Sequence, residues 1–313
     1  MKEKFLLLKD DDSCLGGILG VGRNDIEKIK TTADGKISFI GFNEKTFCAI
    51  DSCCGQQAIY PLKEISIKKP IKYVVMDLDG TSITSEELWI EIIRLTVSRI
   101  LGKEIEFSEE DIPFVFGHTT IEHLDYALKK YGEKNVDYGN VADIYYEVSR
   151  IELEKKMEGG LKGIGLVDGL KEFLLELKRR GKKIGLVSSG LFYKAIPEIE
   201  NAFKQMQLGD PKQFYDAIIM GGVEKRKGNY ATLGELAAKP HPWLYKELVY
   251  NGLKVTDNSE VLVIEDSASG VLSARLAGYA VIGMNSGNIA ASGLSELCLA
   301  CVDTFDDVLK IIS

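Results

Sequence analysis

The chain of 313 residues is long enough for two or three domains with a sizeable hydrophobic core. Its hydrophobic fraction of 45% and charged fraction of 27% are ordinary for a soluble globular protein. The net charge of -8 argues against a dedicated nucleic-acid or anionic-membrane binder, because such an interface would be basic. A small anionic substrate is compatible with it, since local cations or a metal set the field inside a pocket.

The N-terminal stretch MKEKFLLLKDDDS has only four consecutive apolar residues, too few for the core of a signal peptide. No apolar run approaches the length of a membrane span, so we expect a cytoplasmic protein. We then expect reduced thiols rather than a disulfide scaffold from the six cysteines, Cys14, Cys48, Cys53, Cys54, Cys298 and Cys301. A zinc tetrad of Cys53, Cys54, Cys298 and Cys301 is disfavoured, because the last two lie in an apolar stretch typical of a final sheet strand.

Residues 1–70 are expected to form a small β-rich N-terminal domain, whose role the sequence does not indicate. KISFIGF and TFCAID are typical of strands, and the pair Asp34-Gly35 indicates a hairpin. The stretch GGILGVG at 16–22 is not set between a strand and a helix of a βαβ unit. We therefore expect turns of a β domain there rather than a phosphate-binding loop.

From residue 71 onward the pattern changes to alternating strands and helices. Short apolar runs typical of buried strands begin at residues 73, 183, 216, 261 and 280, and helical stretches lie between them. This repeat predicts an α/β fold, a doubly wound parallel sheet of the Rossmann type, built from residues 71–84 and 164–313. In such sheets ligands bind beyond the carboxyl ends of the strands.

Residues 85–163 interrupt this repeat with helical stretches only. Trp89, Ile93, Val97 and Ile100 form one apolar stripe. A plain helical bundle is one interpretation. Because the segment follows the first strand of the sheet, we expect it to cover the site as a cap.

Polar residues follow the predicted strands at the edge where ligands bind. The set comprises Asp77, Asp79, Gly80 and Thr81; Ser188, Ser189 and Gly190; Lys239 in the segment KPHPW; and Glu265 with Asp266. If the sheet is parallel, the strand-end groups converge on one cleft. Clustered carboxylates favour a hard divalent cation, and Mg²⁺ prefers a few oxygen ligands together with water and phosphate.

This pattern suits phosphoryl transfer. Asp77 could attack phosphorus to form an aspartyl-phosphate, and Asp79 could protonate the leaving oxygen and later activate water. Lys239, Ser188 and backbone N–H groups of the loops would hold the phosphate oxygens. The phosphate-binding cation could also be Lys225, Arg226 or Lys227. We favour Lys239 because nearby prolines fix its backbone.

These motifs resemble those of the haloacid dehalogenase-like superfamily. D-x-D-G-T stands at 77–81, h-h-h-S is matched at Leu186-Val187-Ser188, K-P-x-P stands at 239–242 and E-D-S-x-x-G at 265–270. The resemblance covers residues 71–313. It implies Asp77 as nucleophile and Asp79 as acid and base. It also implies Mg²⁺ held by Asp77, the backbone carbonyl of Asp79 and Asp266, with Glu265 beside them. The helical insertion resembles the C1 cap of small-molecule phosphatases and of the β-phosphoglucomutase-like branch.

Three departures from that family pattern bear on the reaction. Thr84 and Ser85 stand where an acid usually follows D-G-T, Trp89 replaces the histidine of the mutase branch, and Thr120 replaces its cap arginine. An apparent insertion at 222–238 also precedes Lys239. Hydrolysis is therefore favoured over mutase activity. His118 in the cap is expected as a substrate contact.

The sequence thus predicts a Mg²⁺-dependent phosphatase acting on a small phosphorylated metabolite, with no nucleic-acid or membrane partner. The alternatives within the family are a phosphosugar mutase, a phosphonatase or a dehalogenase. An alternative of another class is a regulatory protein that binds a partner through residues 1–70. The sequence does not indicate the oligomeric state.

Overall fold

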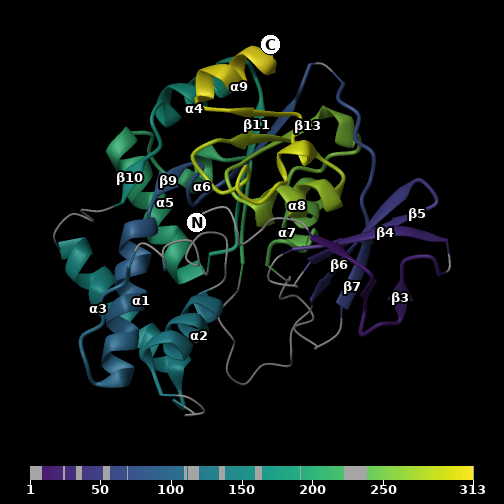
Figure 1. The fold of residues 1–313 in the computed structure, drawn as a ribbon. Coiled ribbons are helices and arrows are strands. Elements are labelled where there is room, and N and C mark those ends of the chain that lie inside the picture. The colour runs from purple at the N-terminus through teal and green to yellow at the C-terminus, as the bar shows by residue number, and fades with distance from the viewer. Residues whose placement is uncertain are drawn as a thin grey trace.

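A computed structural model of the protein describes residues 9–23, 25–32, 37–51, 57–68, 70–108, 111, 120–133, 138–158, 164–190, 192–221 and 238–312. The α/β part, a helical segment and an antiparallel sheet lie side by side (Figure 1). Several predicted features lie outside the described residues: the Asp34-Gly35 turn, Cys53, Cys54, His118 and residues 222–237. The Thr120 side chain is likewise not described.

The α/β part is built on a parallel sheet with the strand order β12-β11-β8-β13-β14-β15. Its strands are β8 (Tyr73–Asp77), β11 (Lys183–Ser188), β12 (Ala217–Met220), β13 (Val261–Glu265), β14 (Ala280–Met284) and β15 (Ala300–Val302). Side chains of β8 alternate between the two faces, so Val74 and Met76 join one apolar cluster while Val75 joins another. The sequence runs that begin at 73, 183, 216, 261 and 280 are confirmed as strands.

Helices cover both faces of this sheet. The cluster containing Val74 packs against α4 (Leu170–Arg179), α5 (Phe192–Met206) and α9 (Phe305–Ile311). The cluster containing Val75 packs against α7 (Trp243–Glu247), the π-helical turn η3 (Leu248–Gly252) and α8 (Ala268–Ala277). Shorter elements are α6 (Pro211–Phe214), η4 (Asn258–Glu260) and η5 (Ser295–Leu297). A doubly wound α/β fold is therefore confirmed.

The helical segment contains α1 (Glu86–Leu101), α2 (Thr120–Tyr131) and α3 (Val141–Glu158). Trp89, Ile93 and Val97 of the predicted stripe on α1 are buried. At its base, β9 (Ile83–Thr84) pairs antiparallel with β10 (Gly165–Leu166). This pairing, which was not predicted, ties together the two chain segments that connect the helices to the core.

The N-terminal sheet has the antiparallel order β1-β4-β5-β6-β7. Its strands are β1 (Lys9–Asp11), β4 (Ile26–Thr31), β5 (Ile37–Phe42), β6 (Lys45–Asp51) and β7 (Gln57–Pro61). Thr31 pairs with Ser38, so the predicted hairpin is confirmed. The glycine-rich stretch connects β2 (Ser13–Cys14) and β3 (Leu19–Gly20), which pair as a hairpin in agreement with a β domain.

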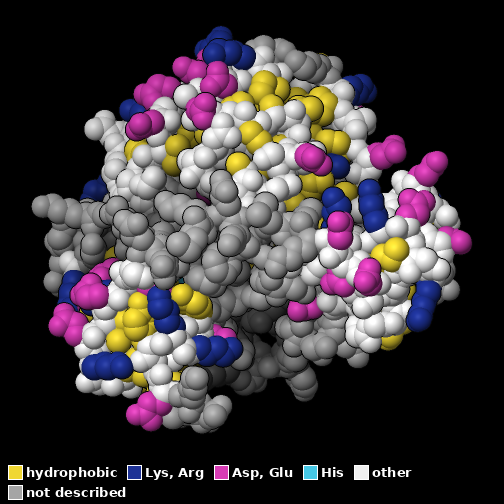
Figure 2. Space-filling model, in the orientation of Figure 1, with side chains coloured by type: hydrophobic (Ala, Val, Ile, Leu, Met, Phe, Trp, Pro, Cys, Tyr) yellow, Lys and Arg dark blue, Asp and Glu magenta, His cyan; other side chains and the backbone are white. Residues whose placement is uncertain are grey.

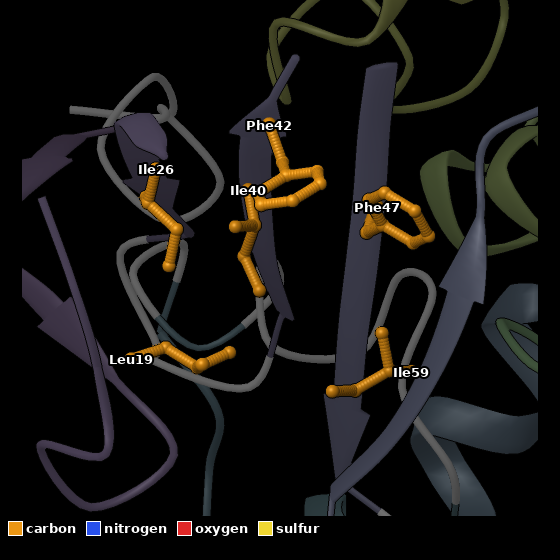
Figure 3. Close-up of a pocket in the computed structure, with 6 residues that line it drawn as sticks. All are labelled: Leu19, Ile26, Ile40, Phe42, Phe47 and Ile59. Atoms are coloured by element: carbon orange, nitrogen blue, oxygen red, sulfur yellow. The ribbon is translucent and has the colours of Figure 1, made fainter. Parts of the chain in front are cut away.

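The two faces of this sheet have different neighbours. One face, including Cys48 and Ile50, packs against Leu272 and Leu276 of α8. The opposite face carries a pocket of about 140 Å³ lined by Leu19, Ile26, Ile40, Phe42, Phe47 and Ile59 (Figure 3). Because its lining is apolar, this pocket has no side chain that could bind phosphate or a metal.

On the face shown in Figure 2, acidic and basic side chains are interspersed, and no surface of a single sign dominates the part that is described. Among the described residues, no helix is both long and apolar enough to span a bilayer.

Candidate active site

The polar strand-end residues gather at the carboxyl edge of the parallel sheet because β11, β8 and β13 are neighbours. Val187 pairs with Asp77, so Ser188 ends the adjacent strand one residue further on. Ile264 pairs with Met76, which places Glu265 beside Asp77 on the other side. The topology alone thus brings together groups that are more than a hundred residues apart in the sequence.

Lys239 joins the acids of β8 and β13. Its Nζ donates to Asp77 Oδ1, and it also donates to Glu265 Oε1 at 2.5 Å. The Lys239 side chain is only 5% exposed. Burial would lower the pKa of this ammonium, but Asp77 and Glu265 raise it above its ordinary value, so Lys239 is a fixed positive charge.

Glu265 is fully buried and has donors for both oxygens. Besides Lys239, Tyr245 on α7 donates its hydroxyl to Oε1, and the Ser267 hydroxyl donates to Oε2 at 3.1 Å. Gly270 in the first turn of α8 makes room for this carboxylate, because a Cβ there would lie 2.0 Å from it. The final position of E-D-S-x-x-G therefore has to be glycine, because any side chain there would clash with Glu265.

The loop after β8 brings Asp266 against the first motif. Gly80 has φ +79°, and a Cβ on it would meet Asp266 Oδ2 at 2.1 Å, so glycine is required for both reasons. Thr81 donates its hydroxyl to Asp266 Oδ1 at 3.0 Å, and Ser82 donates to the Asp77 carbonyl at 2.6 Å. These bonds fix the turn by which the chain leaves the strand.

Asp79 lies apart from the other carboxylates and has its own partners. Ser85 donates its hydroxyl to Asp79 Oδ1 at 2.7 Å, and Lys194 on α5 lies 3.3 Å from the same oxygen. The Ser188 hydroxyl lies 3.4 Å from Asp79 Oδ2. Burial would raise the pKa of Asp79, but Lys194 and Ser85 hold it below its ordinary value.

The loop after β11 carries donors at the same edge. The Gly190 N–H donates to Ser188 Oγ at 2.8 Å. The Lys239 backbone N–H donates to Ser189 Oγ at 3.2 Å. This bond connects the loop after β11 with residues 239–242, which we call the lysine loop.

The carboxylates of Asp77, Glu265 and Asp266 fit a divalent cation. One oxygen of each lies within 4.8 Å of the others, and all three residues are buried. Burial and repulsion from Glu265 raise the pKa of Asp77 well above its ordinary range, although Lys239 opposes this shift. Carboxylate oxygens are ligands that Mg²⁺ prefers, and a bound cation would relieve the repulsion between these three carboxylates.

Comparison with known proteins agrees with this geometry. The family model described as haloacid dehalogenase-like hydrolase matches residues 74–284, which contain all the motif residues described above. The chain belongs to this family.

Solved structures of haloacid dehalogenase-like proteins share its fold. A presumed β-phosphoglucomutase from Thermotoga maritima is 23% identical, with a TM-score of 0.53, over 77% of this chain and 100% of that one. A predicted phosphoglycolate phosphatase from Haemophilus somnus 129PT is 19% identical, with a TM-score of 0.58, over 78% and 99%. CbbY from Rhodobacter sphaeroides in complex with phosphate is 20% identical, with a TM-score of 0.57, over 76% and 96%. A search of curated proteins finds no significant match.

In this haloacid dehalogenase-like chain, Lys194 is a site residue that the sequence analysis missed. Its ammonium lies 4.2 Å from the centre of the Trp89 ring as well as beside Asp79. Trp89 in turn donates its indole N–H to Glu198 at 2.7 Å. The spacing of Lys194 and Glu198 on one helix was the available signal, but nothing in the sequence places that helix face against Asp79.

Tyr245 was also missed. It lies six residues after Lys239, and its hydroxyl reaches the same carboxylate as the lysine. In the segment KPHPWLY only Lys239 was predicted as a site residue, whereas Tyr245, the third residue of α7, also bonds to Glu265.

Proposed function

We propose that this protein is a Mg²⁺-dependent phosphatase that hydrolyses a small phosphorylated metabolite through an aspartyl-phosphate. The observation that supports this most is the joint placement of Asp77, Asp266 and the Lys239 ammonium at one buried strand edge. Three carboxylates and a fixed cation in this arrangement suit a dianionic phosphate together with a divalent metal.

In the first step a carboxylate oxygen of Asp77 attacks phosphorus, and the bond to the leaving oxygen breaks. Asp79 donates a proton to that oxygen, so the product leaves as an alcohol. In the second step Asp79 removes a proton from water, which attacks the phosphorus of the aspartyl-phosphate. The Asp77 carboxylate and inorganic phosphate are then released.

Donors around Asp77 would hold the phosphate oxygens. We assign this role to Lys239, to the Ser188 hydroxyl, and to the loops at Gly80-Thr81 and Ser189-Gly190. The Lys239 ammonium already contacts Asp77, so it lies next to the atom that would attack. A substrate contact by His118 stays a prediction.

Asp77, Asp266 and the backbone carbonyl of Asp79 are the groups that would hold Mg²⁺. When bound, the cation neutralises phosphate charge and lets the Asp77 carboxylate approach phosphorus. Glu265 lies in the same acidic cluster, but its oxygens accept from Lys239, Tyr245 and Ser267. We therefore propose that its main role is to hold the lysine.

Hydrolysis is favoured over phosphoryl transfer between sugar positions. The place of the mutase histidine is taken by Trp89, which is 6% exposed and bonded to Glu198. An indole in that position cannot accept a proton as imidazole does. CbbY from Rhodobacter sphaeroides has also been crystallised with xylulose-(1,5)bisphosphate, which agrees with a phosphorylated small molecule as the substrate class.

Hydrolysis of p-nitrophenyl phosphate with Mg²⁺ and with excess chelator tests this proposal. We expect turnover only with Mg²⁺, and a loss of at least about a hundredfold in Asp77→Asn and Asp79→Asn. Asp12→Asn, at an exposed aspartate between β1 and β2, serves as a matched control with unchanged activity. Full turnover in Asp77→Asn would refute the nucleophile. No hydrolysis of any phosphate ester would favour a regulatory protein.

A further inference from the structure

His241 connects the candidate active site with the N-terminal sheet. It lies two residues after Lys239 and is 8% exposed. Tyr60 of β7 lies with its hydroxyl 2.9 Å from His241 Nδ1, and His241 Nε2 lies 3.2 Å from the Asp51 carbonyl at the end of β6. Both ring nitrogens thus have partners in a part of the chain that precedes the matched family segment, residues 74–284.

The direction of these bonds follows from their chemistry. A carbonyl oxygen only accepts, so His241 Nε2 donates its proton to Asp51. Nδ1 of the neutral ring then accepts from the Tyr60 hydroxyl. Burial lowers the pKa of His241, which agrees with a neutral ring.

The lysine loop has contacts with the acids of the site on one side and with the N-terminal sheet on the other. Lys239 and Tyr245 extend inward to Glu265, whereas His241 extends outward to the N-terminal sheet. The His241 carbonyl also accepts from the Ser273 hydroxyl of α8 at 2.6 Å. The position of the loop relative to the core therefore depends on contacts at His241.

The same sheet also supports the metal side of the site. Cys48 and Ile50 pack against Leu272 and Leu276 of α8, the helix that begins just after Asp266. Arg275 of α8 donates to the Lys63 carbonyl at 3.2 Å, which adds a polar contact between the two parts. The lysine loop and α8 therefore both contact residues of the N-terminal part.

We propose that the N-terminal sheet positions the phosphate-binding lysine, with Tyr60 and His241 as positioning residues that act through Lys239. This inference rests on the role proposed above for Lys239. It gives residues 1–70 a part in the reaction rather than a separate binding activity.

Tyr60→Phe tests the proposal because it removes one hydroxyl and keeps the ring against His241 and Trp243. We expect kcat/KM for p-nitrophenyl phosphate to fall about fivefold, the factor that one neutral hydrogen bond supplies. The inhibition constant of inorganic phosphate should rise by a similar factor. Deuterium exchange of backbone amides in residues 238–245 should become severalfold faster.

Ile40→Val is the control for stability, because Ile40 lies on the opposite face of the same sheet. It should lower the melting temperature by a few degrees and leave kinetics, phosphate inhibition and exchange in 238–245 unchanged. Tyr250→Phe, at an exposed tyrosine, should change nothing.

A double-mutant cycle separates positioning from general loosening. If the hydroxyl acts through the histidine, Tyr60→Phe has no further effect on kcat/KM or exchange in a His241→Phe background. Additive effects, or the same kinetic change in Ile40→Val, would overturn the proposal. If the wild-type protein hydrolyses no phosphate ester, the proposed function fails, and the exchange measurements alone decide whether the sheet holds the loop.

Discussion

Lys194 lies where it can set the protonation state of Asp79. Its ammonium is 3.3 Å from Asp79 Oδ1, and its side chain is 18% exposed, so solvent screens the pair only in part. Burial would lower the pKa of Lys194, but Asp79 and Glu198 together raise it. The pair therefore favours the ionised form of both groups in the protein without substrate, which is the form of Asp79 that would remove a proton from water in the proposed second step. Asp79 would have to take up a proton before the proposed first step.

Lys194→Met should move the acidic limb of the kcat profile to higher pH. Without the ammonium the pKa of Asp79 rises, so the carboxylate needed for the second step is lost at a higher pH. Profiles of p-nitrophenyl phosphate hydrolysis with saturating Mg²⁺ measure this shift. Lys194→Arg, which keeps the charge, should retain the wild-type limb. An unmoved limb in Lys194→Met would show that the ammonium does not tune Asp79.

Asp77→Asn should raise stability without metal while it abolishes turnover. Burial and Glu265 raise the pKa of Asp77 in the folded state, so its ionised form opposes folding at pH 7. Removing the charge should raise the melting temperature in chelator by about 2 °C. Mg²⁺ should then stabilise the wild-type protein more than the variant. A lower melting temperature of Asp77→Asn in chelator contradicts the electrostatic account.

In the helical segment, the Asp111 carboxylate connects α2 with the chain that follows α1; we call this contact the Asp111 anchor. This residue is 2% exposed and accepts hydrogen bonds from Lys130, Tyr131 and Tyr126 of α2 and from Ser108. Burial would raise the pKa of Asp111, but hydrogen bonds from Lys130 and Tyr131 hold it far below its ordinary value. The carboxylate therefore ties α2 to the chain that follows α1.

Asp111→Asn should cost about 2 kcal/mol of unfolding free energy at pH 7, because charged hydrogen bonds are lost. A depressed folded pKa contributes stability above the unfolded value and loses it as the pH falls. The difference between the proteins should thus be complete at pH 7 and shrink below about pH 4. Asp125→Asn, which breaks an exposed pair with Lys129, should cost under about 0.5 kcal/mol. Equal effects in denaturant melts would contradict the anchor.

The elements that the sequence predicted share a local signal. Tyr73–Met76 and Val261–Ile264 are apolar runs ending on acids, and a parallel sheet puts such ends together. Contacts between distant segments left no such signal. The β9–β10 pairing involves strands of only two residues, and Tyr60 meets His241 across 181 positions. Lys194 was missed for the same reason, since its helix face is set by packing.

For the molecule as a whole, the proposed function requires a chain with a net charge of -8 to attract a phosphate. Among the described residues, the charged groups at the site are the acids Asp77, Asp79, Glu265 and Asp266 and the lysines Lys194 and Lys239. When all are ionised, four negative and two positive charges leave a net -2, which one divalent cation cancels. In the proposed function, a divalent cation rather than the net charge of the chain would therefore attract the phosphate to this site.

The division into residues 1–70, a core of 71–84 with 164–313, and a cap of 85–163 stays a prediction. Tyr60 contacts His241 of the K-P-x-P segment, and the Lys63 carbonyl accepts from Arg275 of α8, so residues 1–70 fold against the core rather than alone.

The most direct measurement of the central claim is an acid quench of the Mg²⁺-loaded protein during turnover of p-nitrophenyl phosphate that carries a radiolabelled phosphoryl group. We expect label on the protein, located by mass spectrometry on the peptide that contains Asp77. Hydroxylamine should remove this label, as it does from an acyl phosphate, and Asp77→Asn should carry none. Rapid hydrolysis with no label on the protein at any quench time, or label on another residue, would contradict it.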